Sequence, residues 1–335
     1  MKPLPFELPA VICPESGDGA AQREKSDRDD SDPDRLCSGI IALSASGQRK
    51  KGALAGLAAD RECKISELIL RYKKKMKALG KEGADFYYIR SPKSLREARA
   101  AILAARKTFS GPAVISFEVN DEGVSEFGSD AMALYVIAEG MGASAFGLTM
   151  ENAGYAEMAD VFSRVAPYAR IPLLASGRRA RELSDAFPQI GLFESDAGAG
   201  ICSLSFVESL NRPSFYKRDP ELILAASNNE AFFLDAAADF QQEIGCGPDF
   251  PEKILEAEEE GGGLKITVGS AYDVDILDQY QYMINRPVCF CPLNPEILEA
   301  ALKAYNGRAF FDSESCDIDE NYLTYLKDFY GVIEL

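Results

Sequence analysis

The fold of this chain is decided by residues 65–89, which read ISELILRYKKKMKALGKEGADFYYI. The first part predicts an amphipathic helix, because apolar side chains recur on one face while lysines gather on the other. The apolar face holds Ile65, Leu68, Ile69, Tyr72, Met76 and Leu79, and the polar face holds Lys73, Lys74, Lys75 and Lys77. Residues 85–89 then form a short, continuous apolar run, which is typical of a strand buried on both faces.

The same alternation continues through the first half of the chain. Further strands are predicted at 39–43, 113–119, 145–149 and 171–175, and helices at 130–139, at 155–166 and from Ser91-Pro92 onward. Serine followed by proline marks a helix start, because serine caps the helix and proline fits its first position. Repeated β-then-α units imply a parallel sheet, and their number suits a TIM-like (β/α) barrel.

Composition divides the chain into three parts. Residues 15–35 are rich in Asp, Ser, Gly and Arg, which predicts an exposed or mobile loop after one short strand at 6–13. A polar stretch with Pro213 and Pro220 precedes a second β/α series, with strands expected at 222–226, 231–234, 264–268, 287–291, 309–312 and 331–335. We therefore expect an N-terminal strand and flexible loop at 1–35, the barrel at 36–212 and a smaller α/β domain at 213–335.

The 335-residue chain has a net charge of −17 and contains no histidine. Phosphate groups are bound by basic surfaces, so we expect neither nucleic acid nor a membrane as a partner. Without imidazole, Ser-His-Asp and Cys-His mechanisms and histidine metal sites are excluded. No apolar run reaches membrane-spanning length and the N-terminus lacks a signal-peptide pattern, so a cytoplasmic location is expected.

The eight cysteines form no CxxC pair, and a cytoplasmic chain keeps them reduced. Cys289 and Cys291 lie two apart in an apolar run, so they share one face of a strand. The two thiols could bind a metal ion or pack in the core. We expect two buried core thiols, since a free cysteine packs as a small hydrophobe.

Several stretches together resemble one family of barrel enzymes. They are Ile65–Tyr72, Leu79, Gly83–Ile89, Leu95–Ile102 and Gly142–Leu148, and they resemble the barrel of homocysteine S-methyltransferases over about residues 36–210. The resemblance implies a barrel that holds zinc on three cysteines and activates a thiol on it. One segment, Phe6–Cys13, stands where the family has two strands, so the barrel is either incomplete at its N-terminus or remodelled there.

The positions that match the family's zinc ligands have mostly changed. Where the family has Gly-Leu-Asn-Cys, this chain has Gly147-Leu-Thr-Met150, which puts a thioether in place of a thiolate. Where the family has Gly-Gly-Cys-Cys-Gly, this chain has Ala199-Gly-Ile201-Cys202-Ser203, which keeps only Cys202. Zinc at a catalytic site needs three protein donors, so we expect no zinc and no other cofactor.

The substrate positions that the resemblance identifies have changed as well. The family's Ile-Glu-Thr, whose glutamate binds the amino group of homocysteine, is Ile89-Arg90-Ser91 here, which reverses the charge. Arg90, together with Arg178 and Arg179 after the seventh strand, could hold a small anionic ligand. Alternatively, these arginines are solvated or pair with Glu118, Glu151 or Glu194.

The C-terminal part bears a weaker resemblance to a second family. Residues 286–302 and 305–313 look like part of the pterin-binding barrel of folate-dependent methyltransferases, which would make Asp312 an acceptor for pterin ring nitrogens. Too few strands are predicted there to complete such a barrel. Ordinary β/α packing is the alternative explanation of the pattern.

Three hypotheses about function follow. The first is a divergent homocysteine S-methyltransferase-like protein that has lost zinc-dependent thiol methylation and binds a ligand or partner in one-carbon or corrinoid metabolism. Its corrinoid partner would be a separate protein, since the Asp-x-His-x-x-Gly cobalamin signature needs a histidine. The second is an active S-methyltransferase with a different acceptor or donor, using Cys202. The third is an assembly module whose C-terminal domain makes oligomer contacts.

Overall fold

The computed structural model describes residues 2–14 apart from 6 and 9, 38–44, 49–55, 63–108 apart from 82, 112–150, 153–176, 180–194 and 212–335. The chain forms two compact units. Unit 1 comprises residues 1–126 and 143–216, and unit 2 comprises residues 127–142 and 217–335. The predicted loop at 15–35 lies outside the described residues.

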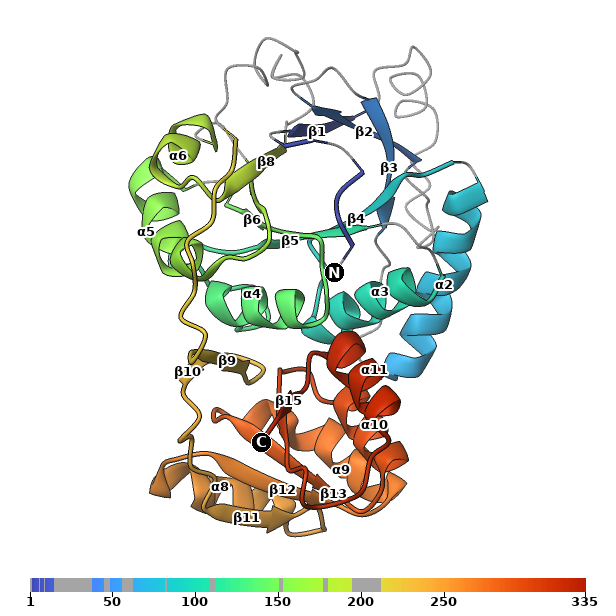
Figure 1. The fold of residues 1–335 in the computed structure, drawn as a ribbon, viewed down its shortest axis with the longest axis vertical. Helices are drawn as coiled ribbons and strands as arrows, with labels where there is room; N and C mark the ends of the chain where they lie inside the picture. The colour runs from blue at the N-terminus through green and yellow to red at the C-terminus, as the bar shows by residue number, and fades with distance from the viewer. Residues whose placement is uncertain are drawn as a thin grey trace. The chain divides into compact units, whose positions relative to one another are not determined.

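Unit 1 contains a closed barrel in which the described strands follow one another in chain order (Figure 1). The strands are β1 (Ala10–Pro14), β2 (Ser38–Ser44), β3 (Arg49–Ala55), β4 (Phe86–Arg90), β5 (Ala113–Glu118), β6 (Ala145–Thr149), β7 (Leu173–Ser176) and β8 (Ile190–Glu194). From β3 to β8 every neighbouring pair is parallel, and β8 also pairs in parallel with β1. The prediction of an α/β fold with parallel strands is confirmed.

The front of the barrel departs from the β-then-α repeat. Strand β2 runs antiparallel to both β1 and β3, with Ala10 opposite Ser44 and Leu43 opposite Arg49. Parallel strands need a crossover of a dozen or more residues, whereas antiparallel strands can follow a short turn. Only residues 45–48 separate β2 from β3, so these two strands can pair only in the antiparallel sense.

The described helices of unit 1 are α2 (Ile65–Lys81), α3 (Leu95–Thr108), α5 (Tyr155–Val165) and α6 (Ala180–Ala186), with a 3₁₀ turn at Ala166–Tyr168. Helix α2 buries the apolar face that its periodicity predicts and packs against α3. The buried hydroxyl of Tyr72 on α2 donates to Glu97 Oε1 on α3 at 2.6 Å, which gives the carboxylate a partner between the two helices.

The barrel interior is filled by alternate residues of the strands. Its buried core includes Ala10, Ile12, Phe86, Tyr88, Val114, Ala145, Leu174 and Leu192. Side chains two apart on a strand share a face, so Arg90, Ser116, Thr149, Ser176 and Glu194 continue these interior rows toward the carboxyl ends of their strands. Polar side chains therefore replace apolar ones at that end of the barrel.

Unit 2 contains a five-stranded sheet, a two-stranded hairpin and helices that include α4 (Ala131–Gly140). The sheet strands are β11 (Gln242–Gly245), β12 (Leu264–Val268), β13 (Val288–Pro292), β14 (Phe310–Phe311) and β15 (Ile333–Glu334), and the hairpin strands are β9 (Ile223–Ala226) and β10 (Ala231–Leu234). The remaining helices are α8 (Phe250–Glu260), α9 (Ala271–Tyr280), α10 (Pro295–Ala304) and α11 (Glu320–Tyr330), with a 3₁₀ turn at Gln281–Met283. Among the described helices, none has the length and apolarity to cross a bilayer.

The five-stranded sheet of unit 2 is parallel throughout and its strands lie side by side in chain order. One helix connects each consecutive pair, and right-handed crossovers of this kind place all the helices on the same face. Leu264, Ile266 and Val268 are buried on that face of β12, whereas Lys265 and Thr267 are half-buried on the other. We call this second face, which carries none of the connecting helices, the open face. The β9–β10 hairpin covers part of it and packs on Cys289 and Phe310.

Candidate functional site

The candidate site in unit 1 is a group of polar side chains at the carboxyl ends of β4 to β8, the carboxyl-end cluster. Its members are Tyr88, Arg90, Ser116, Thr149, Ser176 and Glu194. Arg90 Nε lies 3.0 Å from Glu194 Oε1, which links the ends of β4 and β8. Tyr88 Oη donates to Glu194 Oε2 at 2.8 Å and lies 2.9 Å from Ser116 Oγ. An ion pair and two hydrogen bonds thus join three strands inside the barrel.

The hydrogen-bond directions in this cluster follow from the charges. Tyr88 is 1% exposed, and burial, followed by the negative charge of Glu194, raises the pKa of its hydroxyl well above the ordinary value. The phenol therefore keeps its proton and donates it to the carboxylate. A tyrosine hydroxyl has a single proton, so Ser116 Oγ must be the donor in its bond to Tyr88 Oη.

Glu194 is 8% exposed, and an isolated buried carboxylate is strongly unfavourable. Here Arg90 supplies the opposite charge and Tyr88 supplies a neutral donor, while the Arg90 side chain keeps 42% of its surface exposed. Removing Arg90 would leave the buried Glu194 charge without compensation, which is the costly case for such pairs, and removing Tyr88 would leave one of its oxygens short of a donor. The charge of Glu194 is therefore neutralised by Arg90, and the position of its carboxylate depends on both Arg90 and Tyr88.

Two further hydroxyls of the cluster are buried without a hydrogen-bond partner in the part of the chain that the structure describes. They are Thr149 Oγ1 and Ser176 Oγ, at the ends of the paired strands β6 and β7. Buried hydroxyls are nearly always bonded, so an unpaired one calls for an explanation such as a bound molecule. These two atoms mark a place where a ligand could supply the missing bonds.

The residues that the sequence singled out fall in different places. Arg90 lies in the carboxyl-end cluster, where it pairs with Glu194, one of the partners weighed from the sequence. Met150 follows Thr149 directly and is 3% exposed. Arg178, Arg179, Ile201 and Cys202 lie outside the described residues. Asp312 lies in unit 2, on the open face of the sheet.

Sequence reasoning did not select Tyr88, Ser116 and Thr149 as site residues. Tyr88 belongs to the apolar run of its strand, and the two hydroxyl residues lie in runs whose pattern predicts buried strands. A signal was nevertheless present, because Tyr88 and Ser116 lie two residues and Thr149 four residues beyond an interior apolar position, each in phase with it. Polar residues in the interior phase near the end of a barrel strand therefore indicate the site.

Zinc is the metal that the resemblance implies, and the described donors do not suit it. Around the carboxyl-end cluster they are the Met150 thioether, the hydroxyls of Thr149 and Ser176, and a Glu194 carboxylate already bound to Arg90. Zinc prefers thiolate, imidazole and carboxylate ligands in a tetrahedral shell. The described residues contain no group of three or more His, Cys, Asp and Glu side chains that could hold a metal ion.

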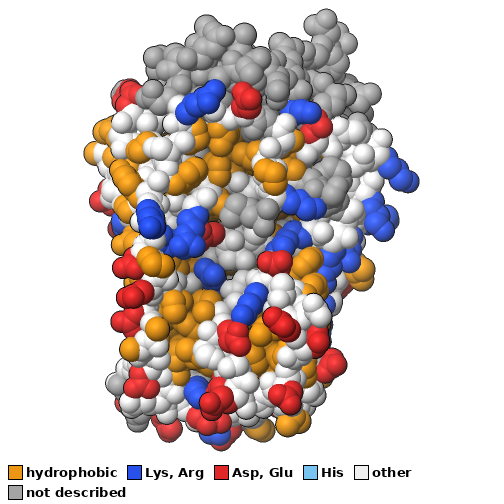
Figure 2. Space-filling model, viewed as in Figure 1, with side chains coloured by type: hydrophobic (Ala, Val, Ile, Leu, Met, Phe, Trp, Pro, Cys, Tyr) orange, Lys and Arg blue, Asp and Glu red, His pale blue; other side chains and the backbone are white. Residues whose placement is uncertain are grey.

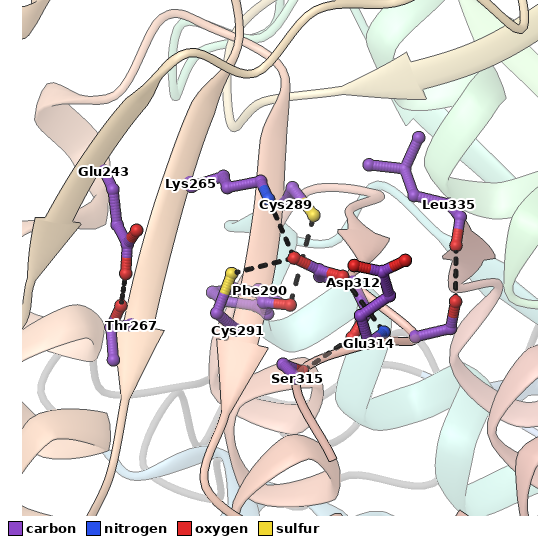
Figure 3. Close-up of polar contacts among 11 residues, drawn as sticks. Glu243, Lys265, Thr267, Cys289, Phe290, Cys291, Asp312, Glu314, Ser315 and Leu335 are labelled. Carbon is purple, nitrogen blue, oxygen red and sulfur yellow. Dashed lines mark hydrogen bonds and ion pairs between the residues drawn. The ribbon is translucent and has the colours of Figure 1, made fainter. Parts of the chain in front are cut away.

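A second polar group lies on the open face of the unit 2 sheet and contains Lys265, Cys289, Cys291 and Asp312 (Figure 3). Lys265 Nζ binds Asp312 Oδ2 at 2.8 Å, and Cys291 Sγ lies 3.7 Å from the same oxygen. The Lys265 ammonium lowers the pKa of Asp312, and Asp312 raises the pKa of Lys265. Both groups are therefore charged at neutral pH.

The visible surface agrees with the acidic composition of the chain. Figure 2 shows many acidic side chains and fewer basic ones over unit 2 on this face. A surface of this sign repels polyanions rather than binding them. This face of unit 2 is therefore unsuited to nucleic acid.

The architecture and the carboxyl-end cluster define an α/β protein whose parallel strands end in a polar, charge-paired group. The sequence model of the homocysteine S-methyltransferase family matches residues 19–186, half of the chain, and the chain belongs to this family. A solved structure of the homocysteine methyltransferase MmuM from Escherichia coli is similar, with a TM-score of 0.41 and 15% sequence identity. That match covers 49% of this chain and 64% of the other. No curated protein sequence matches this chain.

Proposed function

We propose that this chain is a divergent member of its family that has lost zinc-dependent thiol methylation. Its role is to bind a small anionic ligand in one-carbon metabolism, at the carboxyl-end cluster of a TIM-like barrel. The observation that carries the proposal is the Arg90–Glu194 ion pair at 3.0 Å. It puts a cation at the strand end where the resemblance implies a glutamate for an amino group.

The contacts of Arg90 favour a carboxylate as the ligand group. Its Nε faces Glu194, whereas a guanidinium carries five N–H donors in a planar fork, so its outer nitrogens suit a bidentate anion. The negative charge of Glu194 beside it favours an anion of single charge over a polyanion. Thr149 and Ser176 add hydroxyls that can bond to oxygen or nitrogen atoms of the same ligand.

The loss of zinc chemistry is supported by Met150 and by the absence of histidine from the whole sequence. The proposal places the chain beside a separate corrinoid-carrying protein, since it has no histidine to ligate cobalt. This partner, and the limits of the barrel at 36–212 and of the smaller domain at 213–335, rest on the sequence and its resemblance.

The first experiment measures zinc by elemental analysis after reconstitution with excess zinc and desalting, followed by an assay of methyl transfer to homocysteine. We expect well below one zinc per chain and no methylated homocysteine. About one tightly bound zinc together with homocysteine methylation would overturn the proposal. Zinc-bound protein that methylates a different thiol would instead establish the alternative of an S-methyltransferase with another acceptor.

The ligand is tested by calorimetry with small monocarboxylates against the full chain and three variants. Arg90→Gln should weaken binding by about tenfold or more, because a charge-assisted bidentate contact contributes about 1.5–3 kcal/mol. Ser176→Ala should weaken it less. Arg164→Gln is the matched control, because Arg164 pairs with Asp160 on the exposed side of helix α5, and ligand binding by this variant should be unchanged. Equal binding by the Arg90 and Arg164 variants would exclude the carboxyl-end cluster as the site.

A further inference from the structure

On the open face of the unit 2 sheet, two thiols, a lysine and a carboxylate lie close to one another. They are the thiol cluster: Lys265 on β12, Cys289 and Cys291 on β13, and Asp312 after β14 (Figure 3). Cys291 donates to Asp312 Oδ2 at 3.7 Å, and the same oxygen binds Lys265 Nζ at 2.8 Å. Cys289 Sγ donates to Phe290 O at 4.0 Å, and residues 289 and 291 lie two apart on the same strand.

Strand register explains why these residues meet. Lys265 is paired with Cys289, and Thr267 with Cys291, across β12 and β13. Cys289 is paired with Phe310 across β13 and β14, and Asp312 N bonds to Phe290 O at 3.0 Å. Residues 289 and 291 share a face because side chains on a strand alternate with a period of two. The spacing Cys-x-Cys thus places both sulfurs beside the Lys265–Asp312 pair.

The two thiols have unequal surroundings. Cys289 is fully buried, with 0% exposure, whereas Cys291 is half-buried and nearer the carboxyl end of the strand. The contact with Cys289, and to a smaller extent the Lys265 ammonium, lowers the pKa of Cys291, while burial, Asp312 and Glu243 oppose this shift. The contact with Cys291 and burial raise the pKa of Cys289. Cys291 is therefore the more accessible and the more acidic thiol of the pair, and Cys289 is the buried, less acidic one.

We propose that the thiol cluster is a second reactive site, at which a small hydroperoxide oxidises Cys291 and Cys289 then closes a reversible disulfide with it. In the first step Cys291 loses its proton to water, its sulfur attacks the outer oxygen, an S–O bond forms, the O–O bond breaks, and the alkoxide or hydroxide leaves with a proton from water. In the second step Cys289 sulfur attacks Cys291 sulfur, the S–O bond breaks, and water leaves with the Cys289 proton. The peroxide is reduced by two electrons and the two thiols are oxidised by the same number.

The geometry suits this chemistry better than the alternatives. A metal ion is disfavoured because the Lys265 ammonium already occupies Asp312 Oδ2, the oxygen nearest to Cys291. Residues two apart on a strand have Cα atoms about 6.6 Å apart, near the upper limit for a disulfide. The bridge is therefore stretched and readily reduced, which is the property of a reversible disulfide and not of a structural one.

The test treats the reduced full chain with hydrogen peroxide and follows each cysteine by peptide mass spectrometry. The peptide that carries both cysteines should lose about 2 Da and regain it with dithiothreitol. In Cys289→Ser, oxidation should stop at a sulfenic acid on Cys291 that dimedone traps. In Cys291→Ser, Cys289 should stay reduced, because it is buried. Cys246, whose pKa burial raises to about 12, is the internal control and should react at least about tenfold more slowly.

A second set of variants tests the role of Lys265. Lys265→Met should slow oxidation of Cys291 by about tenfold, and Lys265→Arg should restore most of the rate, because the cation and not the lysine itself stabilises the thiolate. Thermal unfolding of each variant controls for loss of fold. The proposal is wrong if Cys291 reacts no faster than Cys246 in the folded chain, or if Cys291 is oxidised but the Cys289–Cys291 bridge never forms. It is also wrong if Lys265→Met, still folded, reacts at the wild-type rate.

Discussion

At the scale of single residues, Tyr88 connects the two halves of the carboxyl-end cluster. Its hydroxyl donates to Glu194 and accepts from Ser116, so one buried phenol joins β4, β5 and β8. Because burial and Glu194 both raise its pKa, this donor persists across the physiological pH range. The position of the Glu194 carboxylate therefore depends on a neutral neighbour as well as on Arg90.

Tyr88→Phe should lower the free energy of unfolding by about 1–3 kcal/mol, because it leaves a buried carboxylate oxygen and a buried serine hydroxyl short of a partner. Urea unfolding at pH 7, monitored by circular dichroism, measures the change. Tyr155→Phe is the control, since Tyr155 is 39% exposed, and its effect should stay within about 0.5 kcal/mol. Equal stability of the two variants would show that the hydrogen bonds of Tyr88 contribute nothing net.

The same scale shows how far the sequence could predict the site. Arg90 is a candidate because it stands where the family resemblance implies a glutamate, and its position at the end of β4 follows from the apolar run before it. Its pairing with Glu194 remains one of several alternatives in the sequence, because the two residues lie 104 positions apart and closure of the barrel brings them together. Tyr88 was hidden because a tyrosine in an apolar strand has the pattern of a core residue.

At the scale of elements, continuous apolar runs predicted strands well and mixed runs did not. The expected strands at 85–89, 113–119 and 145–149 appear as Phe86–Arg90, Ala113–Glu118 and Ala145–Thr149. Strand β3 was missed because Arg49–Ala55 reads RKKGALA, with three cations and a glycine. Strand β11 was missed because it lies at the edge of its sheet, where a strand needs only one apolar face.

Packing between strands inside the barrel leads to a prediction at Gly147. A Cβ atom there would lie 2.8 Å from Leu174 Cδ2 and 2.9 Å from Ser116 Cβ, closer than real Cβ contacts allow. Gly147→Ala should therefore lower the free energy of unfolding by about 1–3 kcal/mol, as overpacking of a filled core does. It should also displace Ser116 from Tyr88. Urea unfolding and a crystal structure of the variant provide the two measurements.

Gly245→Ala is the matched control for Gly147→Ala, because Gly245 also lies in a parallel strand and no atom lies within 4 Å of its Cβ position. This control should be neutral or stabilising by up to about 1 kcal/mol, since alanine restricts the unfolded chain. If the Gly147 variant is as stable as the Gly245 variant, the side chains around Gly147 can move to accommodate a methyl group at little cost in free energy.

At the scale of the whole molecule, the chain has more acidic than basic groups, so its free energy of unfolding should depend on pH in the acid range. The Lys265 ammonium lowers the pKa of Asp312 below its ordinary value of 3.8. A depressed pKa contributes stability that is fully present above the ordinary value and is lost as the pH falls through the folded-state pKa. The stability difference between wild type and Asp312→Asn should therefore be constant from pH 7 to about 5 and shrink below about pH 4. Its size should not exceed about 1 kcal/mol, because the pair is partly solvated.

Urea unfolding between pH 7 and pH 3 measures this difference, and Lys265→Met supplies the control. Without the ammonium, Asp312→Asn should change the pH dependence of stability in the acid range by less, because the largest cause of the lowered pKa is gone. A pH-independent difference in the wild-type background would mean that Asp312 acts only through its neutral hydrogen bonds.

The reversed direction of β2 has a consequence for protein engineering. Ile12 lies opposite Glu194 on β8, and Pro14 lies opposite Ile40 on β2, so β1 ends and β2 begins at the rim that carries Arg90 and Glu194. Both anchor points of the connection between them are thus on that rim. A reporter domain inserted between Pro14 and Ser38 would be tethered next to the charge pair, whereas one inserted between Ser44 and Arg49 would be tethered at the opposite end of the barrel.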